Sequence, residues 1–344
     1  MRTSANIIFL LYAILFALGS FAQTLSFDQA MELFRQRRWA EAAAALQKCD
    51  PAATPALLYR GKALVNLGQF EEAAAALDSY SKTHPQSDDA LYLLAYIRFR
   101  QNQPKESLRL FTDAASLKNP TADDLKVVAL DYVLLGDYAD AARYLEDSLA
   151  MDPGNIEARY HLGRVRYQQN RFDQAIAAFR EVVRRDPGNV KAHDNLGLSL
   201  EAKNEVEGAI AAYREAIRLD ASLTVHDEQP YLNLGVLLAK SKRTEEAIPL
   251  LVRASSIAPN SGKVHYQLAK AYFDLNRFGD AQREAEKAVS LDPGESPDHY
   301  LLGRIYQRSG KSELAGEQFR LTEQLIHAKS PGSSNGMASE MNSR

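Results

Sequence analysis

A row of hydrogen-bonding side chains recurs along this chain at nearly constant spacing. His161, Asn195, Asn233 and Gln267 are separated by 34, 38 and 34 residues. Each of these side chains can both donate and accept hydrogen bonds. A row on one face could hold the backbone of an extended peptide at regular intervals. The alternative is a set of ordinary solvated polar residues, and the sequence leaves both interpretations open.

The sequence carries none of the common catalytic or metal-binding motifs. It has no His-Glu-x-x-His, Cys-x-x-Cys, Gly-x-Ser-x-Gly or Gly-x-Gly-x-x-Gly segment. Gly310-Lys311-Ser312 matches the end of a phosphate-binding loop, but Ile305 stands where that loop needs glycine. Acidic residues are abundant, so a paired-carboxylate site stays open. We nevertheless expect no catalysis, no cofactor and no metal.

The row of polar side chains belongs to a repeat that runs through most of the chain. Small residues recur with a period of 34, interrupted by one step of 38, at Gly61, Ala95, Ala129, Gly163, Gly197, Gly235, Ala269 and Gly303. Twelve residues after each comes a second small residue, the first being Ala73 and the last Ala315. A period of this length indicates a stack of similar supersecondary units.

One unit, residues 156–189, shows what the repeating element is. Apolar residues recur at helical spacing in both of its halves, with a break near Asn170. The segment Asp186-Pro187-Gly188-Asn189 then ends the second helix, because proline cannot continue a helix and glycine relaxes the backbone. Each unit is therefore predicted to be two helices joined by a tight turn.

This pattern resembles the tetratricopeptide repeat. Counted from the first residue of each unit, position 8 is Gly or Ala in nine units, position 20 is Ala in eight, with Ser107 the exception, and position 17 is aromatic in five. Small residues at positions 8 and 20 let the two helices approach closely. The nine units begin at Gln23, Thr54, Asp88, Ala122, Ile156, Val190, Glu228, Gly262 and Ser296. The resemblance implies an all-α fold, a right-handed superhelical α-solenoid of tandem helix-turn-helix hairpins over residues 23–325.

Three departures from the repeat are notable. Four extra residues fall in the segment 222–228, which is a candidate hinge or loop. Arg98 and Arg166 occupy position 11, where an apolar residue is usual, so we expect them to extend out of the seam or to loosen their units. Histidines recur at position 4, where core packing and a metal ladder are alternatives; they are His193, His265 and His299.

In tetratricopeptide arrays the first helix of each hairpin lines the concave face through positions 2, 5, 6, 9, 12 and 13. The resemblance therefore places the polar row, at position 6, in a groove, together with basic residues. The predicted peptide-binding residues are His161, Arg164, Lys191, Asn195, Asn233, Lys263, Gln267, Lys270 and Arg304. Basic side chains exceed acidic ones on this face in the last five units, which would suit an acidic partner or a C-terminal carboxylate.

The two ends of the chain differ from the repeats. Arg2 precedes an apolar run at residues 7–18, and the small residues Ser20 and Ala22 follow it. We interpret residues 1–22 as a signal peptide cleaved before Gln23, giving a secreted or periplasmic protein. The alternative is an uncleaved membrane anchor over residues 7–22, although this stretch is short for a span. Residues 326–344 are rich in Ser, Gly and Asn and are predicted to be a disordered tail.

Composition narrows the function further. With 41 basic and 44 acidic residues the net charge is −3, which gives no general attraction to nucleic acid. The single cysteine, Cys49, is either a small core residue or the site of an intermolecular disulfide. We expect a non-catalytic scaffold that binds a protein or peptide, with no small-molecule substrate and with membrane contact only through an uncleaved N-terminus. The alternatives are a self-assembling structural component or an accessory subunit of an envelope enzyme or of a secretion or assembly complex.

Overall fold

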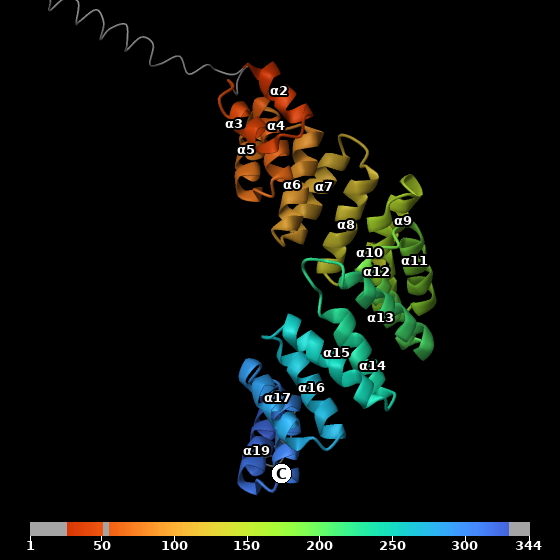
Figure 1. The fold of residues 1–344 in the computed structure, drawn as a ribbon. Helices are drawn as coiled ribbons and strands as arrows, with labels where there is room; N and C mark the ends of the chain where they lie inside the picture. Colours follow the sequence, from red (N-terminus) through yellow and green to blue (C-terminus); the bar gives the residue numbers. More distant parts are fainter. Residues whose placement is uncertain (1–25, 51–54, 330–344) are drawn as a thin grey trace, which may run out of the picture. The chain divides into compact units, whose positions relative to one another are not determined.

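The computed structural model describes residues 26–50 and 55–329, and the regular structure within these ranges is entirely helical (Figure 1). The chain divides into two compact units, residues 1–165 and 166–344. The boundary falls inside helix α10 (Ile156–Gln168), so it does not coincide with the end of a repeat. The predicted signal peptide at residues 1–22 lies outside the described ranges.

The helices alternate along the chain, and an even-numbered helix opens each hairpin. The first unit contains α2 (Phe27–Arg35), α3 (Trp39–Leu46), α4 (Ala56–Asn66), α5 (Phe70–Thr83), α6 (Asp88–Arg100), α7 (Pro104–Ala115), α8 (Ala122–Leu134), α9 (Tyr138–Met151) and most of α10. The second unit continues with α11 (Phe172–Arg185), α12 (Val190–Ala202), α13 (Val206–Asp220), α14 (Gln229–Lys240), α15 (Thr244–Ile257), α16 (Gly262–Asp274), α17 (Phe278–Leu291), α18 (Ser296–Arg308) and α19 (Ser312–Lys329).

The helices pack as antiparallel pairs of neighbours. Helix α6 packs against α7 in the first unit, and α12 against α13 and α16 against α17 in the second (Figure 1). Every odd-numbered helix begins at position 17 of its repeat, from Trp39 in α3 to Ser312 in α19. The expected all-α hairpin architecture is confirmed, and helical periodicity in the sequence was sufficient to predict it.

The turn inside each hairpin has a conformation that recurs at position 15. The residue there has a positive φ, between 56° and 78°, in every described hairpin. It is glycine at Gly68, Gly136 and Gly310, asparagine at Asn102, Asn170, Asn204 and Asn276, and a basic residue at Arg37 and Lys242. The next backbone N–H then donates to the carbonyl oxygen five residues earlier, for example Arg171 to Arg166 at 2.8 Å. This left-handed cap ends the first helix and reverses the chain within three residues.

Position 8 is small because a large side chain from the second helix lies directly on it. A Cβ atom at Gly197 would lie 2.5 Å from the Tyr213 ring, and one at Gly303 would lie 2.6 Å from the Phe319 ring. Tyr213 and Phe319 each occupy position 24 of the same repeat as the glycine they contact. Position 20 also lies close, since the Ser107 hydroxyl donates to the carbonyl oxygen of Ala95 at position 8, at 2.8 Å. The two small positions therefore set the distance between the helices of a hairpin.

The inserted segment 222–228 is fastened to the end of α13. The carboxylate of Asp220 is fully buried and lies 3.0 Å from the His226 Nδ1. It also accepts the Asp227 backbone N–H at 2.9 Å and the Tyr231 hydroxyl at 3.2 Å. A buried carboxylate with three partners fixes the path of the loop, so these contacts favour a formed loop over a hinge.

The structure also bears on two expectations from the sequence, for the C-terminal tail and for Cys49. Helix α19 continues to Lys329, so the first four residues of the predicted tail, 326–329, are helical. The reason is that the segment contains good helix formers and no Gly or Pro before Pro331. Cys49 is half-buried, its Sγ lies 3.5 Å from the Ala45 carbonyl oxygen, and burial raises the pKa of the thiol. Both features favour its structural role.

Among the described residues, none of the helices combines the length and the apolar character that crossing a membrane requires.

Candidate functional site

The even-numbered helices form the inner side of each unit. Successive even-numbered helices contact one another, α4 with α6 and α6 with α8 in the first unit, and α12 with α14, α14 with α16 and α16 with α18 in the second. Successive odd-numbered helices make no such contact in the described ranges. Within each unit the even-numbered helices are therefore the more closely spaced row, and their exposed faces form the candidate binding surface.

In the first unit this surface contains a hollow of about 580 Å3, here called the aromatic hollow. It lies over α6, α8 and the start of α10. Its lining residues are Tyr92, Leu93, Tyr96, Phe99, Arg100, Asp123, Asp124, Lys126, Val127, Leu130, Glu157 and His161. All of them except Asp124 occupy the inner positions 2, 5, 6, 9, 12 and 13. Half of these side chains are apolar or aromatic and half are charged or polar, so the hollow could contact both kinds of group on a ligand.

The polar groups of the aromatic hollow are held in place by the protein. Lys126 donates to Glu157 at 2.6 Å and to Asp123 at 3.0 Å. These bonds fix its ammonium group between α8 and α10, the first helices of two successive hairpins. The Tyr92 hydroxyl donates to the Lys118 carbonyl oxygen at 2.6 Å. Burial, with Arg164 nearby, lowers the pKa of His161 to about 4, so its imidazole is neutral at pH 7. The hollow is consequently formed before any ligand arrives.

In the second unit the inner faces of α12 and α14 are paired with each other. The Asn233 side chain donates to both carboxylate oxygens of Asp194, at 3.0 and 3.1 Å. Asp194 is buried, and this burial raises its pKa to about 6 while Asn233 acts in the opposite direction. Lys240 donates to Glu201 at 2.9 Å. The polar groups of this part of the face therefore stabilise the contact between two repeats.

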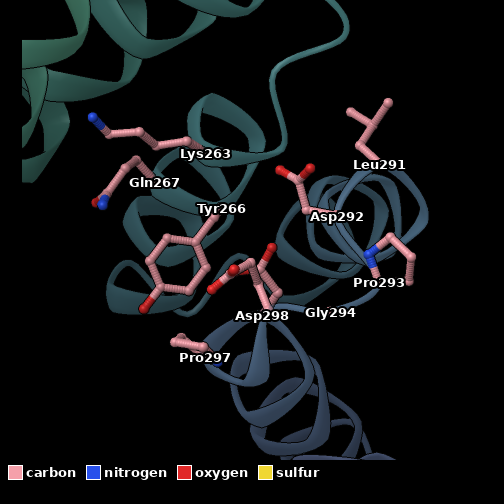
Figure 2. A pocket seen from close by; sticks show the side chains of 10 residues that line it. Lys263, Tyr266, Gln267, Leu291, Asp292, Pro293, Gly294, Pro297 and Asp298 are labelled. Carbon is pink, nitrogen blue, oxygen red and sulfur yellow. The ribbon is translucent and has the colours of Figure 1, made fainter. Parts of the chain in front are cut away.

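A second hollow, of about 700 Å3, lies between α16 and the turn that joins α17 to α18 (Figure 2). We call it the acidic hollow. It is lined by Lys263, Tyr266, Gln267, Leu291, Asp292, Pro293, Gly294, Glu295, Pro297 and Asp298. The lining includes three carboxylates and one ammonium group, that of Lys263. Burial, with Asp292 and Glu295 nearby, raises the pKa of Asp298 to about 6.

The nine predicted groove residues separate into groups. His161 lies in the aromatic hollow, whereas Lys263 and Gln267 lie in the acidic hollow, and Gln267 and Lys270 border a further hollow beside Lys240. Asn233 holds Asp194, as described above. Asn195 donates to the Lys191 carbonyl oxygen of its own helix at 2.8 Å. The polar row thus presents different hydrogen-bonding states along its length.

The remaining predicted groove residues are all exposed. Arg164 and Lys191 are exposed on α10 and α12. Arg304 is exposed on α18, and its guanidinium lies 4.8 Å from the centroid of the Phe273 ring. A cation over an aromatic face in this range is an attractive contact. These three side chains are positioned for ligand contact at the surface rather than inside a hollow.

The recurrent histidines make structural hydrogen bonds. His265 contacts Glu284 at 2.7 Å and the Pro259 carbonyl oxygen at 3.1 Å, and His299 contacts Gln318 at 2.7 Å and the Pro293 carbonyl oxygen at 3.0 Å. Each ring thus joins its own hairpin to the end of the preceding one. These contacts support the packing interpretation over the metal ladder.

Sequence reasoning missed most of the aromatic hollow. The signal was present, because Tyr92, Tyr96 and Phe99 stand at inner positions 5, 9 and 12 of the unit that begins at Asp88. The prediction was based on the polar side chains at position 6, and in this repeat position 6 is the apolar Leu93. Asp298 carried no comparable signal, since position 3 is not an inner position and only the fold brings it into a hollow.

Comparisons with known proteins agree with this architecture. Family models described as tetratricopeptide repeat match residues 58–121, 132–197, 190–223 and 238–305, more than half of the chain in total. The BBSome complex member BBS4 homolog of Drosophila melanogaster is 27% identical over 180 residues, which are 50% of this chain and 37% of that protein. The chain spans less than half the length of the curated relatives it matches.

Two solved structures share the fold. The APC/C hetero-tetramer Cut9–Hcn1 aligns with a TM-score of 0.59 at 18% identity and covers 80% of this chain and 54% of that chain. PilW, described as a widely conserved type IV pilus biogenesis factor, aligns with a TM-score of 0.54 at 23% identity and covers 62% of this chain and 95% of that chain. At these identities the likeness concerns the fold alone.

Proposed function

Because the chain belongs to the tetratricopeptide repeat family, we propose that it is a non-catalytic scaffold that binds an extended protein segment along the inner faces of its even-numbered helices. The observation that carries this proposal is that inner positions line a hollow in each unit. In the aromatic hollow, Tyr96 and Phe99 offer apolar faces. In the second unit, Lys263 and Lys270 are exposed and make no ion pair with the described residues, so they are available for acidic groups of a partner.

The mechanism is preorganisation of the binding surface. Arg100 donates to the Tyr96 hydroxyl at 2.7 Å and lies 4.6 Å from the Phe70 ring centroid, so the wall of the aromatic hollow is already ordered. Lys126 is held between two carboxylates in the same hollow. Binding to side chains that are already ordered costs less conformational entropy than binding that must first order them.

Site-directed photo-crosslinking tests where partners bind. A photoreactive phenylalanine analogue would replace Tyr96 or Lys270 on the inner faces, and Lys105 or Lys287 on odd-numbered helices as exposed controls. We expect partner adducts from the two inner positions and none from the controls. Equal adducts from all four positions would reject the inner face as the site. Adducts of the protein with itself alone would favour a self-assembling component.

An exported location is part of the same proposal. Its support is the sequence of residues 1–22, with Arg2 ahead of an apolar run and small residues before Gln23. Cell fractionation followed by N-terminal sequencing should find a secreted or periplasmic chain that begins at Gln23. A chain that retains Met1 and sediments with membranes would instead support anchoring by residues 7–22.

A further inference from the structure

The acidic hollow contains a largely buried aspartate, Asp298, that has no charge partner among the described residues. Asp298 is 7% exposed, lines the hollow, and makes no side-chain hydrogen bond or ion pair with the described residues. An ionised carboxylate without partners is costly to bury, and structures normally supply such a group with hydrogen bonds or an opposite charge.

The charged groups around Asp298 make its position less favourable. Asp292 and Glu295 both repel its negative charge. Both ring nitrogens of His299 are already used by Gln318 and by the Pro293 carbonyl oxygen. Lys263 extends away from Asp292 and Asp298 in Figure 2 and forms no ion pair with either. The hollow therefore lacks a cation at its buried end.

Asp292 on the other wall lies against the start of α16. A Cβ atom on Gly262 would lie 2.0 Å from Asp292 Oδ2, so the carboxylate occupies the space beside the first residue of α16. The N-terminus of a helix stabilises a negative charge. Both carboxylates line the hollow together with the Tyr266 ring (Figure 2).

We propose that the acidic hollow is a subsite for an arginine or lysine side chain of the bound protein segment. This inference rests on the proposed function and adds a sequence requirement to it. The cationic head would lie between Asp298 and Asp292, and its aliphatic stem would pack on Tyr266 and Pro297. An aromatic face beside two carboxylates suits such a side chain because cation–π attraction adds to the charge-assisted hydrogen bonds.

A basic side chain fits the hollow better than a metal ion does. Within the described residues no group of three His, Cys, Asp or Glu side chains is arranged to hold a metal. Besides Lys263 and Gln267, the walls include the apolar or aromatic side chains of Leu291, Pro293 and Tyr266. Such walls favour an aliphatic stem with a charged end.

Selection from a displayed library of random linear peptides tests the inference. The bait would be the full chain in three forms: wild type, Asp298→Asn, and Glu313→Gln as the control. Glu313 is exposed on α19, outside the hollow, so its variant removes one negative charge from the same unit without altering the subsite. Asp298→Asn keeps the side-chain shape, and circular dichroism would verify that the variant is folded.

We expect wild type and Glu313→Gln to enrich peptides with Arg or Lys at one fixed position, and Asp298→Asn to lose that preference. For a selected peptide, replacing the basic residue by norleucine, or Asp298 by Asn, should weaken binding about tenfold in fluorescence anisotropy. Enrichment of peptides without a basic position, or one that Asp298→Asn retains, would overturn the inference while the scaffold function stands. If wild type enriches no peptides, the proposed binding of extended segments is itself wrong.

Discussion

The substitution Gly197→Ala offers a sharp test of the packing between the helices of a hairpin. The added methyl group would lie 2.5, 2.6 and 2.9 Å from three atoms of the Tyr213 ring. Carbon atoms at contact are about 3.5–4.0 Å apart, so the ring must move by about 1 Å. Tyr213 is fully buried and its hydroxyl donates to Glu201, which leaves the ring little room.

The expected effect is a balance of two terms. Overpacking of this kind costs about 1–3 kcal/mol. Replacing glycine by alanine inside a helix returns about 0.5–1 kcal/mol through backbone entropy. The difference is a destabilisation of about 0–2.5 kcal/mol for Gly197→Ala, or about 1 kcal/mol near the middle of both ranges. Gly316 in α19 has no atom near its missing Cβ, so Gly316→Ala should be stabilising by about 0.5–1 kcal/mol.

Urea unfolding followed by far-ultraviolet circular dichroism measures both changes. A double variant, Gly197→Ala with Tyr213→Leu, tests whether the loss comes from packing. In another repeat the same two positions hold Ala129 and Leu145, and both are fully buried. Adding Tyr213→Leu should therefore cost about 1 kcal/mol less in the Gly197→Ala background than in wild type. If Gly197→Ala is stabilising, as Gly316→Ala is expected to be, the close contact between positions 8 and 24 is wrong.

Three further predictions concern backbone strain and buried carboxylates. Lys242 adopts φ 62°, so Lys242→Gly should raise the free energy of unfolding by about 0.5–1 kcal/mol in urea, and a loss would contradict the strain. Burial raises the pKa of Asp131 to about 7, so the contribution of this group to stability falls by on the order of 3 kcal/mol as pH rises from 4 to 7. The pH profile of Asp131→Asn should lack this fall, and a profile parallel to that of wild type would refute it. Asn233→Ala removes the hydrogen-bond donor of Asp194 and should lower the free energy of unfolding by about 1–3 kcal/mol at pH 8, but by less at pH 5, where Asp194 is protonated. Gln267→Ala is the control, and equal losses in the two variants would contradict this role of Asn233.

The Asn233 prediction revises how the polar row is understood. As a groove residue, Asn233 would affect binding and leave stability unchanged. Its amide instead donates to a buried carboxylate on the neighbouring repeat. The same side chain retains its carbonyl oxygen as an acceptor, so contact with a ligand and support of the fold are both open to it. Measuring stability and binding on the same variant distinguishes the two.

The sequence by itself determined the repeat, the helices and the face that they expose. Position 17 begins every second helix, and position 8 is small in every unit, because local helix signals and close packing constrain residue type at fixed spacing. The left-handed residue at position 15 was less visible, since asparagine, glycine, Arg37 and Lys242 all occupy it. There the hairpin geometry sets the conformation and residue type follows it only loosely.

Only the tertiary structure decided what the inner positions do. Asn195, Asn233 and Gln267 are similar residues at equivalent positions, yet one bonds its own helix, one holds a buried carboxylate and one lines a hollow. Asp298 lines a hollow because α16 and the turn after α17 lie beside the start of α18. Burial and charge arise from neighbours that are distant in sequence or on another repeat, and residue spacing along one helix contains no information about them.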